Sequence, residues 1–326
     1  MKNEILKKIE KIRKNRNLNS TDFLSIDDFS VDEILMILEI AKIFRDAKTE
    51  KFDFLKGFSA ALAFFESSTR TRSSFEWAGK HLGADTINVG GGTAEKKGES
   101  VIDLAQTLDA MSPRFLIVRT SKSGLPAQIA AHTAAAVINA GDGWHEHPSQ
   151  AVLDLLTAVD HFGQIAGKEI LFVGDILHSR VFGSTARIFQ KFGAKIKIAA
   201  PATFVPEKIS EIFGAEVFFD LDAAIKNADI VYALRVQSER GATGDIPTLR
   251  EYSKAFGISA ARFSRARENA ILMHPGPIQR DIDIHHALAD FPQSRILRQV
   301  ENGLAVRKAI FFLLGTGPAK KDFSRI

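Results

Sequence analysis

Short apolar runs alternate with amphipathic helical stretches along almost the whole of this chain. The runs are bounded by Gly, Pro, Asn or Asp and have the length of buried strands, whereas the stretches between them have helical spacing. This alternation is typical of an α/β fold, in which helices cover a parallel sheet. We expect helices such as 73–82 and 100–111, and strands at residues 58–65, 85–89, 115–118, 135–139, 169–173, 195–199, 216–219, 229–234 and 270–273.

The length of 326 residues suits two domains better than one hydrophobic core. Residues 148–162 have helical spacing and separate the earlier strands from the later ones, so we place the domain hinge there. The expected domains are residues 1–150 and 151–300, with a last helix at residues 303–314, in the segment 301–326, packing back on the first domain. Because ligands of open parallel sheets bind beyond the carboxyl ends of the strands, we expect the active site in the cleft between the domains.

Composition excludes several classes of function. The chain has no cysteine, which rules out disulfides, thiolate nucleophiles and Cys-ligated zinc. It has neither the roughly 18 uninterrupted apolar residues of a membrane helix nor the apolar segment of a secretory signal, so we expect a cytoplasmic protein with no membrane partner. The net charge is +4, but Lys and Arg are scattered among 39 acidic residues, which favours a small anionic substrate over nucleic acid.

A dense polar segment, SSTRTRSS, follows the first expected strand. It lies at a helix start, where backbone N–H groups and the helix dipole favour an anion, and its hydroxyls and guanidinium groups add donors. The alternative is an ordinary helix cap with a surface pair between Arg72 and Glu76. Neither GxxxxGK[ST] nor GxGxxG is present, which disfavours a nucleotide. The residues predicted to bind a phosphate are Ser68, Thr69, Arg70 and Thr71.

Polar residues also follow the next three strands of the first half. Residues 90–100, GGGTAEKKGES, form a Gly-rich basic loop that either closes over an anion or is a simple exposed turn. Arg119 follows the third strand, and His147 and Gln150 follow the fourth. The pair His145 and His147 raises the alternative of a metal site, but no Cys or HExxH pattern supports one.

In the second half, Arg180 follows one strand, and Arg235 and Gln237 follow another. The kinked element 275–277 follows a third strand. Each arginine can instead pair with a surface carboxylate. Two separated guanidinium groups with an amide nevertheless suit a substrate that carries two carboxylates.

Taken together, these segments resemble the motifs of the aspartate/ornithine carbamoyltransferases. The resemblance extends from about Leu24 to about Leu314, and its pattern RxQxER and lack of cysteine are similar to the aspartate branch. The ornithine branch usually carries HPCQ and a cysteine in a CLP element. The matching segments are STRTRSSFE at 68–76, KKGES at 96–100, HPSQAVLDL at 147–155, LRVQSER at 234–240 and HPGPIQRDIDI at 274–284.

The resemblance implies roles for individual residues. Those holding the phosphate of carbamoyl phosphate are Ser68, Thr69, Arg70 and Thr71. Those polarising its carbonyl are Thr71, Arg119 and His147, and those around its amide are Gln150 and the backbone of Pro275, Gly276 and Pro277. Those binding the aspartate carboxylates are Arg180, Arg235 and Gln237. Those lent by a neighbouring subunit are Thr93 and Lys97, and Lys97 serves both substrates.

The resemblance further implies a homotrimer with shared active sites and no metal or organic cofactor. Its reaction would carbamoylate the α-amine of L-aspartate, early in pyrimidine biosynthesis. Association with regulatory chains or with other pyrimidine enzymes stays open. The alternatives are a carbamoyltransferase for another amine such as ornithine, which would want acidic or neutral residues in place of Arg235 and Gln237, and a non-catalytic family member.

The chain departs from the family pattern at several positions. Thr93 stands where the family often has Ser, which keeps the hydroxyl, and Gly276 stands where some members have Leu. Trp144, His145 and residues 1–20 have no familiar counterpart. We expect the indole of Trp144 either to pack at the hinge or to narrow the entrance to the site.

Overall fold

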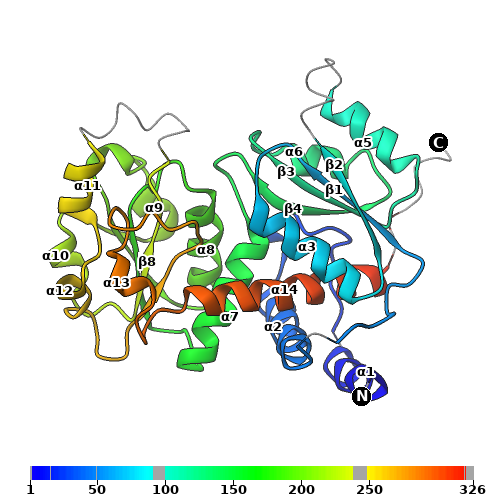
Figure 1. Ribbon diagram of the computed structural model, residues 1–326, viewed down its shortest axis with the longest axis horizontal. Coiled ribbons are helices and arrows are strands. Elements are labelled where there is room, and N and C mark those ends of the chain that lie inside the picture. The colour runs from blue at the N-terminus through cyan, green and yellow to red at the C-terminus, as the bar shows by residue number, and fades with distance from the viewer. Residues whose placement is uncertain are drawn as a thin grey trace. The chain divides into compact units, whose positions relative to one another are not determined.

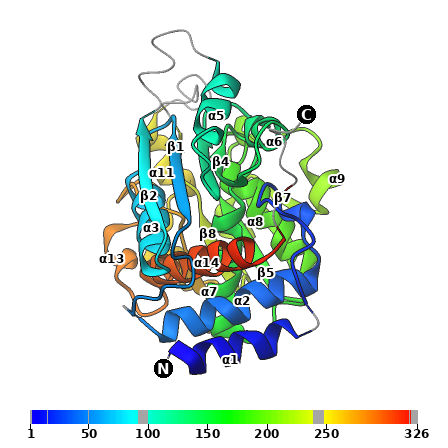
Figure 2. The ribbon, with the colours of Figure 1, turned by 90° about the vertical axis from the view of Figure 1, so that its right-hand side faces the viewer.

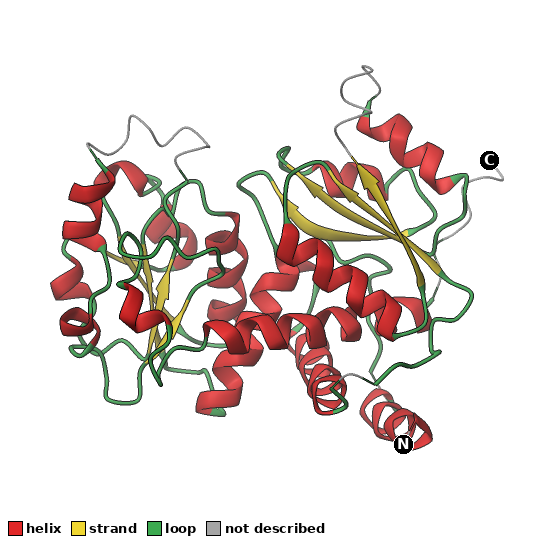
Figure 3. Ribbon diagram, viewed as in Figure 1, coloured by secondary structure: helices red, strands yellow, loops and turns green. Residues whose placement is uncertain are grey.

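The computed structural model describes residues 2–14, 16–48, 50–90, 100–237, 248–318 and 320. The chain divides into two compact units, a first unit of residues 1–153 and 301–326 and a second unit of residues 154–300. The divisions fall inside α7 (Pro148–Phe162) and α14 (Ile296–Thr316), labelled in Figure 1. Each unit contains its own parallel sheet, yellow in Figure 3, which confirms the α/β fold with two sheets that the sequence predicts.

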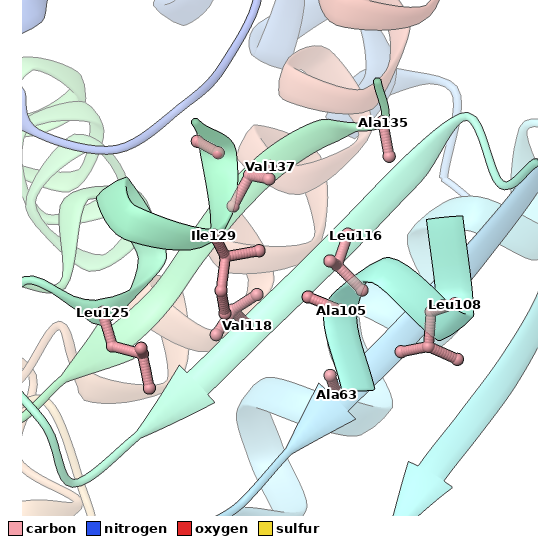
Figure 4. Packing of buried hydrophobic residues seen from close by; sticks show 11 residues of the cluster. Ala63, Ala105, Leu108, Leu116, Val118, Leu125, Ile129, Ala135 and Val137 are labelled. Carbon is pink, nitrogen blue, oxygen red and sulfur yellow. The ribbon is translucent and has the colours of Figure 1, made fainter. Parts of the chain in front are cut away.

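The sheet of the first unit has the strand order β2-β1-β3-β4, with all neighbours parallel. On one of its faces, α5 (Val101–Asp109) and α6 (Leu125–Ala130) contribute Leu108 and Ile129 to an apolar core with Val118, as Figure 4 shows. The strands are β1 (Ser59–Phe64), β2 (Asp85–Gly90), β3 (Phe115–Thr120) and β4 (Ala136–Asp142). Since side chains alternate between the two faces of a strand, the continuous burial of β4 indicates that both faces are covered.

Aromatic side chains pack on the opposite face of this sheet. The ring centroid of Phe311 in α14 lies 4.9 Å from that of Phe115 in β3 and 5.9 Å from that of Phe75 in α3 (Thr69–His81). Among the described residues, the first unit also contains α1 (Lys2–Arg13), η1 (Ile26–Asp28) and α2 (Val31–Asp46), and α1 and α2 lie side by side in Figure 2.

The sheet of the second unit has the strand order β7-β6-β5-β8-β9 and is also entirely parallel. Its strands are β5 (Glu169–Val173), β6 (Lys195–Ala199), β7 (Glu216–Phe218), β8 (Ile230–Ala233) and β9 (Ile271–Met273). Its helices are α8 (Arg180–Lys191), η2 (Ala202–Phe204), α9 (Ile209–Phe213), α10 (Leu221–Ala224), α11 (Leu249–Phe256), α12 (Ala260–Phe263) and α13 (His286–Ala289).

All the strands expected from the sequence are present, but two helices start earlier than expected. Helix α3 begins at Thr69 rather than at residue 73, and α14 begins at Ile296 rather than at residue 303. Gly303 lies inside α14, and its missing side chain permits close packing at this point of the helix. A Cβ there would lie 2.7 Å from Arg307 Nη1 and 3.2 Å from Leu153 Cδ2. Within the described residues, no helix combines the length and the apolar character that a membrane crossing needs.

Candidate active site

The start of α3 is arranged differently from the starts of other helices in this chain. Its N-cap residue, Ser68, has extended backbone and makes no side-chain capping hydrogen bond. By contrast, the Ser or Thr N-caps of α2, α5, α8, α11 and α12 all accept a backbone N–H. The Ser68 hydroxyl is therefore not used for the cap that the alternative interpretation requires, and a helix start of this kind suits a bound anion.

The side chains around this helix start differ in exposure. Thr69 and Arg70 are exposed, whereas Thr71 is buried. The backbone of Thr71 is anchored, because Ser74 Oγ donates a hydrogen bond of 2.9 Å to its carbonyl. An exposed cation and hydroxyl thus stand at the positive end of a helix of 13 residues.

Arg119 lies at the carboxyl end of β3, beside the chain that leaves β1. Phe65 N donates to Arg119 O at 2.9 Å, so the two segments stay paired beyond the last residue of β1. The register between β3 and β4 shifts around Arg119, and its Nη1 donates to Ala140 O at 3.1 Å. Its Nε lies 3.6 Å from Glu66 Oε2. These contacts fix the guanidinium at the edge of the sheet where β1 and β4 also end.

Asp142, at the end of β4, organises the turn that leads to His147. It accepts hydrogen bonds from Gly124 N at 2.7 Å and from Glu146 N at 3.0 Å, and its Oδ2 lies 3.0 Å from His145 Nδ1. Burial, the largest influence, raises the pKa of this carboxyl, but hydrogen bonds from His145, Asn139 and Gly124 together hold the pKa below its usual value. His145 is thus engaged with Asp142 and shapes the turn.

His147 and Gln150 are held at the start of α7. His147 is 4% exposed, and its carbonyl accepts from Gln150 N at 2.9 Å and from Ala151 N at 3.3 Å. Because β1, β3 and β4 are adjacent and parallel, their carboxyl ends bring Ser68 to Thr71, Arg119 and His147 to one edge of the first sheet. Thr93 and Lys97, predicted to join them, lie outside the described residues.

In the second unit, the segments after β5 and β8 are hydrogen-bonded to each other. Gln237 donates from its backbone N to Asp175 Oδ2 at 3.1 Å and from Nε2 to the carbonyl of His178 at 2.9 Å. His178 Nδ1 lies 2.9 Å from Asp175 Oδ1, and both residues are buried. This network fixes Gln237 and the preceding Arg235 beside the loop that leads to Arg180, the first residue of α8.

Gly174 permits this close approach of the two segments. It has a φ of +124°, and a Cβ there would collide with the carbonyl oxygen of Leu234 and lie 2.8 Å from Tyr252 Oη. Burial, and secondarily the carboxylates of Asp283 and Asp175, raise the pKa of Tyr252 well above its ordinary value, so its phenol stays neutral. Only a residue without a side chain fits between these groups.

The Pro275–Gly276–Pro277 element after β9 is held through His274. Gly276 N donates to His274 Nδ1 at 2.7 Å, so the ring proton is assigned to Nε2, which lies 3.3 Å from Asp283 Oδ2. His274 N donates to Gln299 Oε1 at 2.9 Å, and the peptide bond before Pro277 is cis.

Asp154 of α7 supports this arrangement from the interior of the second unit. It is fully buried and accepts from Gln299 Nε2 at 2.8 Å, from Tyr232 Oη at 2.7 Å and from Thr185 Oγ1 at 3.1 Å. These hydrogen bonds compensate for the burial of the carboxylate, and they link α7, α8, β8 and α14 to the 275–277 element.

The sequence interpretation did not assign the supporting carboxylates. Asp142 is the last residue of β4, and Glu66 and Asp175 come two residues after β1 and β5, so their position at strand ends is a usable signal. Asp154 and Gln299 lie on helices among apolar residues, and no pattern in the sequence marks them as partners of His274.

Comparison with known proteins adds to this geometry. A family model described as "Aspartate/ornithine carbamoyltransferase, carbamoyl-P binding domain" matches residues 21–160, and one described as "Aspartate/ornithine carbamoyltransferase, Asp/Orn binding domain" matches residues 166–314. The aspartate carbamoyltransferase catalytic subunit of Syntrophotalea carbinolica is 44% identical over 308 residues, which cover 93% of this chain and 98% of that relative.

Two solved structures show the same fold. Aspartate transcarbamoylase of Trypanosoma cruzi, in complex with N-(phosphonacetyl)-L-aspartic acid, has a TM-score of 0.82 at 26% identity, covering 90% of this chain and 96% of that one. Ornithine carbamoyltransferase of Thermus thermophilus has a TM-score of 0.81 at 26% identity, covering 90% of this chain and 99% of that one.

Proposed function

Because the chain belongs to the aspartate/ornithine carbamoyltransferase family, we propose that it transfers the carbamoyl group of carbamoyl phosphate to the α-amine of L-aspartate. The products are N-carbamoyl-L-aspartate and phosphate, in an early step of pyrimidine biosynthesis. The choice of aspartate rests on the 44% identity to the aspartate carbamoyltransferase catalytic subunit of Syntrophotalea carbinolica over 93% of this chain.

The first unit binds carbamoyl phosphate. Ser68, Thr69, Arg70 and Thr71 hold the phosphate at the start of α3, which is supported by the Ser68 hydroxyl that no capping bond occupies. Thr71, Arg119 and His147 donate toward the carbonyl oxygen, and Gln150 with the backbone of Pro275, Gly276 and Pro277 surrounds the amide. Their common function is to hold the acyl group in one orientation.

The chemistry needs no protein nucleophile, because the carbamoyl group is already activated by its phosphate. The deprotonated amine attacks the carbonyl carbon, the C–N bond forms, and negative charge builds on the carbonyl oxygen. Donors from Thr71, Arg119 and His147 stabilise that charge more than they stabilise the ground state. The C–O bond to phosphate then breaks, and the leaving phosphate can accept the amine proton.

The second unit binds aspartate. Arg180 and Arg235 neutralise its two carboxylates, and Gln237 adds an amide held in place by Asp175 and His178. Charge neutralisation on both substrates is essential, since carbamoyl phosphate and aspartate are anions that repel each other. Ornithine, with an ammonium side chain, would face like charges at these arginines.

The assembly we propose is a homotrimer in the cytoplasm, with Thr93 and Lys97 of one subunit completing the site of its neighbour. This arrangement is implied by the family motif around these two residues. Sedimentation of the purified chain tests it, and a monomer that is fully active would contradict it.

The proposal is tested by titrating the chain with N-(phosphonacetyl)-L-aspartic acid, which carries a phosphonate and two carboxylates. Because one molecule then engages both anion sites, we expect it to bind at least about a hundredfold more tightly than inorganic phosphate or succinate alone. Binding no tighter than that of phosphate would contradict a shared site for the two substrates.

A further inference from the structure

The loop that follows the 275–277 element carries a cluster that carbamoyl transfer does not use. Asp281, His285 and His286 are all exposed, and ligand atoms from the three residues lie within 4.8 Å of one another. We propose that these residues form a binding site for a divalent transition-metal ion such as Zn²⁺. The proposal does not depend on the proposed enzymatic function, since it concerns a separate set of side chains.

The carboxylate of Asp281 already orients one of the imidazoles. Its Oδ1 accepts from His286 N at 3.0 Å and lies 2.8 Å from His286 Nδ1. Carboxylates placed in this way commonly support metal-binding histidines. Among the described residues, Asp281 Oδ2 and His286 Nε2 make no hydrogen bond and can coordinate an ion. His285 Nδ1 accepts from Ala287 N at 3.4 Å, and this long hydrogen bond is given up when the ring proton moves to Nδ1 and Nε2 coordinates the ion.

The dimensions and chemistry of the cluster fit a transition metal. Zinc bonds to nitrogen and oxygen are about 2.0–2.2 Å long, so atoms around one ion stand roughly 3–4 Å apart. The side chains reach this spacing by rotation, because they are exposed and the ring centroids of His285 and His286 are 4.2 Å apart. Two imidazoles with one carboxylate favour zinc, nickel or copper over magnesium or calcium, and leave a position for water.

The backbone and the nearest cation are also compatible with an ion at this place. Asp281 has a left-handed φ of 65°, and its N donates to the Ile284 carbonyl at 2.8 Å, which holds the carboxylate toward the histidines. Arg280 Nη1 donates to the His286 carbonyl at 2.9 Å and lies 3.4 Å from Asp290 Oδ2. The positive charge of Arg280 is thus paired with Asp290.

The experiment is calorimetric titration of the full-length, tag-free chain with ZnCl₂. We expect one ion per chain, and we expect the double variant His285→Ala with His286→Ala to weaken binding by at least about tenfold. Asp281→Asn should weaken it as well. The matched control is His132→Ala, because His132 is an exposed histidine outside the cluster, and this variant should bind zinc like the wild type.

Two results would overturn the proposal. One is a wild-type chain that takes up no zinc in the titration. The other is zinc uptake that the double variant retains at full affinity, which would place the ion elsewhere. Unchanged circular dichroism of the exposed-residue variants ensures that a loss of binding is not a loss of fold.

Discussion

In the first unit, Thr69 and Arg70 at the start of α3 are exposed, whereas in the second unit Gln237 belongs to a hydrogen-bond network with buried residues. Ser68 makes no capping bond, and Thr69 and Arg70 are exposed. Gln237, by contrast, is hydrogen-bonded to Asp175 and to the carbonyl of His178. The proposed phosphate site therefore contains side chains that are open to solvent, whereas Gln237 of the proposed aspartate site is positioned by other residues.

The two units also differ in how many hydrogen bonds a buried ionisable side chain makes. Lys308 in the first unit is 1% exposed, and its Nζ donates only to the carbonyl of Lys48, at 3.1 Å, among the described residues. Asp154 in the second unit receives three hydrogen bonds. Removing the charge of Lys308 should therefore raise the free energy of unfolding, whereas removing the carboxylate of Asp154 should lower it.

The largest effect is expected at the start of α3. Arg70→Ala removes a guanidinium that is exposed at the proposed phosphate site, and we expect kcat/KM to fall by about 10²–10³. Arg72→Ala is the matched control, since Arg72 is an exposed arginine on the same helix that the proposal does not use, and its kinetics should stay close to those of the wild type. An equal loss of kcat/KM in both variants would mean that the effect comes from general surface charge and not from a phosphate site at Arg70.

The second prediction concerns Asp154. Asp154→Ala leaves three buried donors without their acceptor, and we expect the free energy of unfolding in urea to fall by about 3 kcal/mol. Asp160→Ala on the same helix is the control, because Asp160 is an exposed residue whose side chain, 15% exposed, lies 3.5 Å from the exposed side chain of Arg298, a pair worth about 1 kcal/mol or less. A loss for Asp154→Ala as small as that of the control would contradict a stabilising network.

The third prediction is a substitution that raises the free energy of unfolding. Burial lowers the pKa of Lys308 from 10.5 to about 8, which corresponds to a destabilisation of roughly 3 kcal/mol at pH 7. Lys308→Met removes this cost but also a hydrogen bond of about 1 kcal/mol, so the variant should be about 2 kcal/mol more stable at pH 7.

The dependence of stability on pH follows from the lowered pKa of Lys308. Between pH 8 and pH 10.5 the unfolded chain keeps a proton on Lys308 that the folded chain has released, so wild-type stability rises with pH in this window. The advantage of Lys308→Met should therefore shrink as pH rises through it. Urea unfolding at both ends of the window measures this, with the exposed Lys56→Met as a control that shows no such trend.

The fold was predictable because its signals are local. Most of the strands are short apolar runs that end at a turn residue, and such runs are enough to predict buried parallel strands. The starts of α3 and α14 were placed too late, since hydroxyl residues and Gly303 resemble helix boundaries when their packing partners are unknown.

The sequence points to candidate site residues only near the ends of strands. Arg119, Arg180 and Arg235 were predicted in this way, and their roles stay predictions. The link from Asp154 through Gln299 to His274 was not predicted, because it joins residues 145 positions apart, and hydrogen bonds between distant helices leave no periodicity in the sequence.

The central claim is carbamoyl transfer to aspartate, and the most direct test is an initial-rate assay of the purified chain with carbamoyl phosphate and either L-aspartate or L-ornithine. The account predicts N-carbamoyl-L-aspartate and phosphate in equal amounts, with ornithine at least about a hundredfold poorer in kcat/KM because its ammonium group meets Arg180 and Arg235. A chain that released no phosphate with aspartate, or that preferred ornithine, would contradict it.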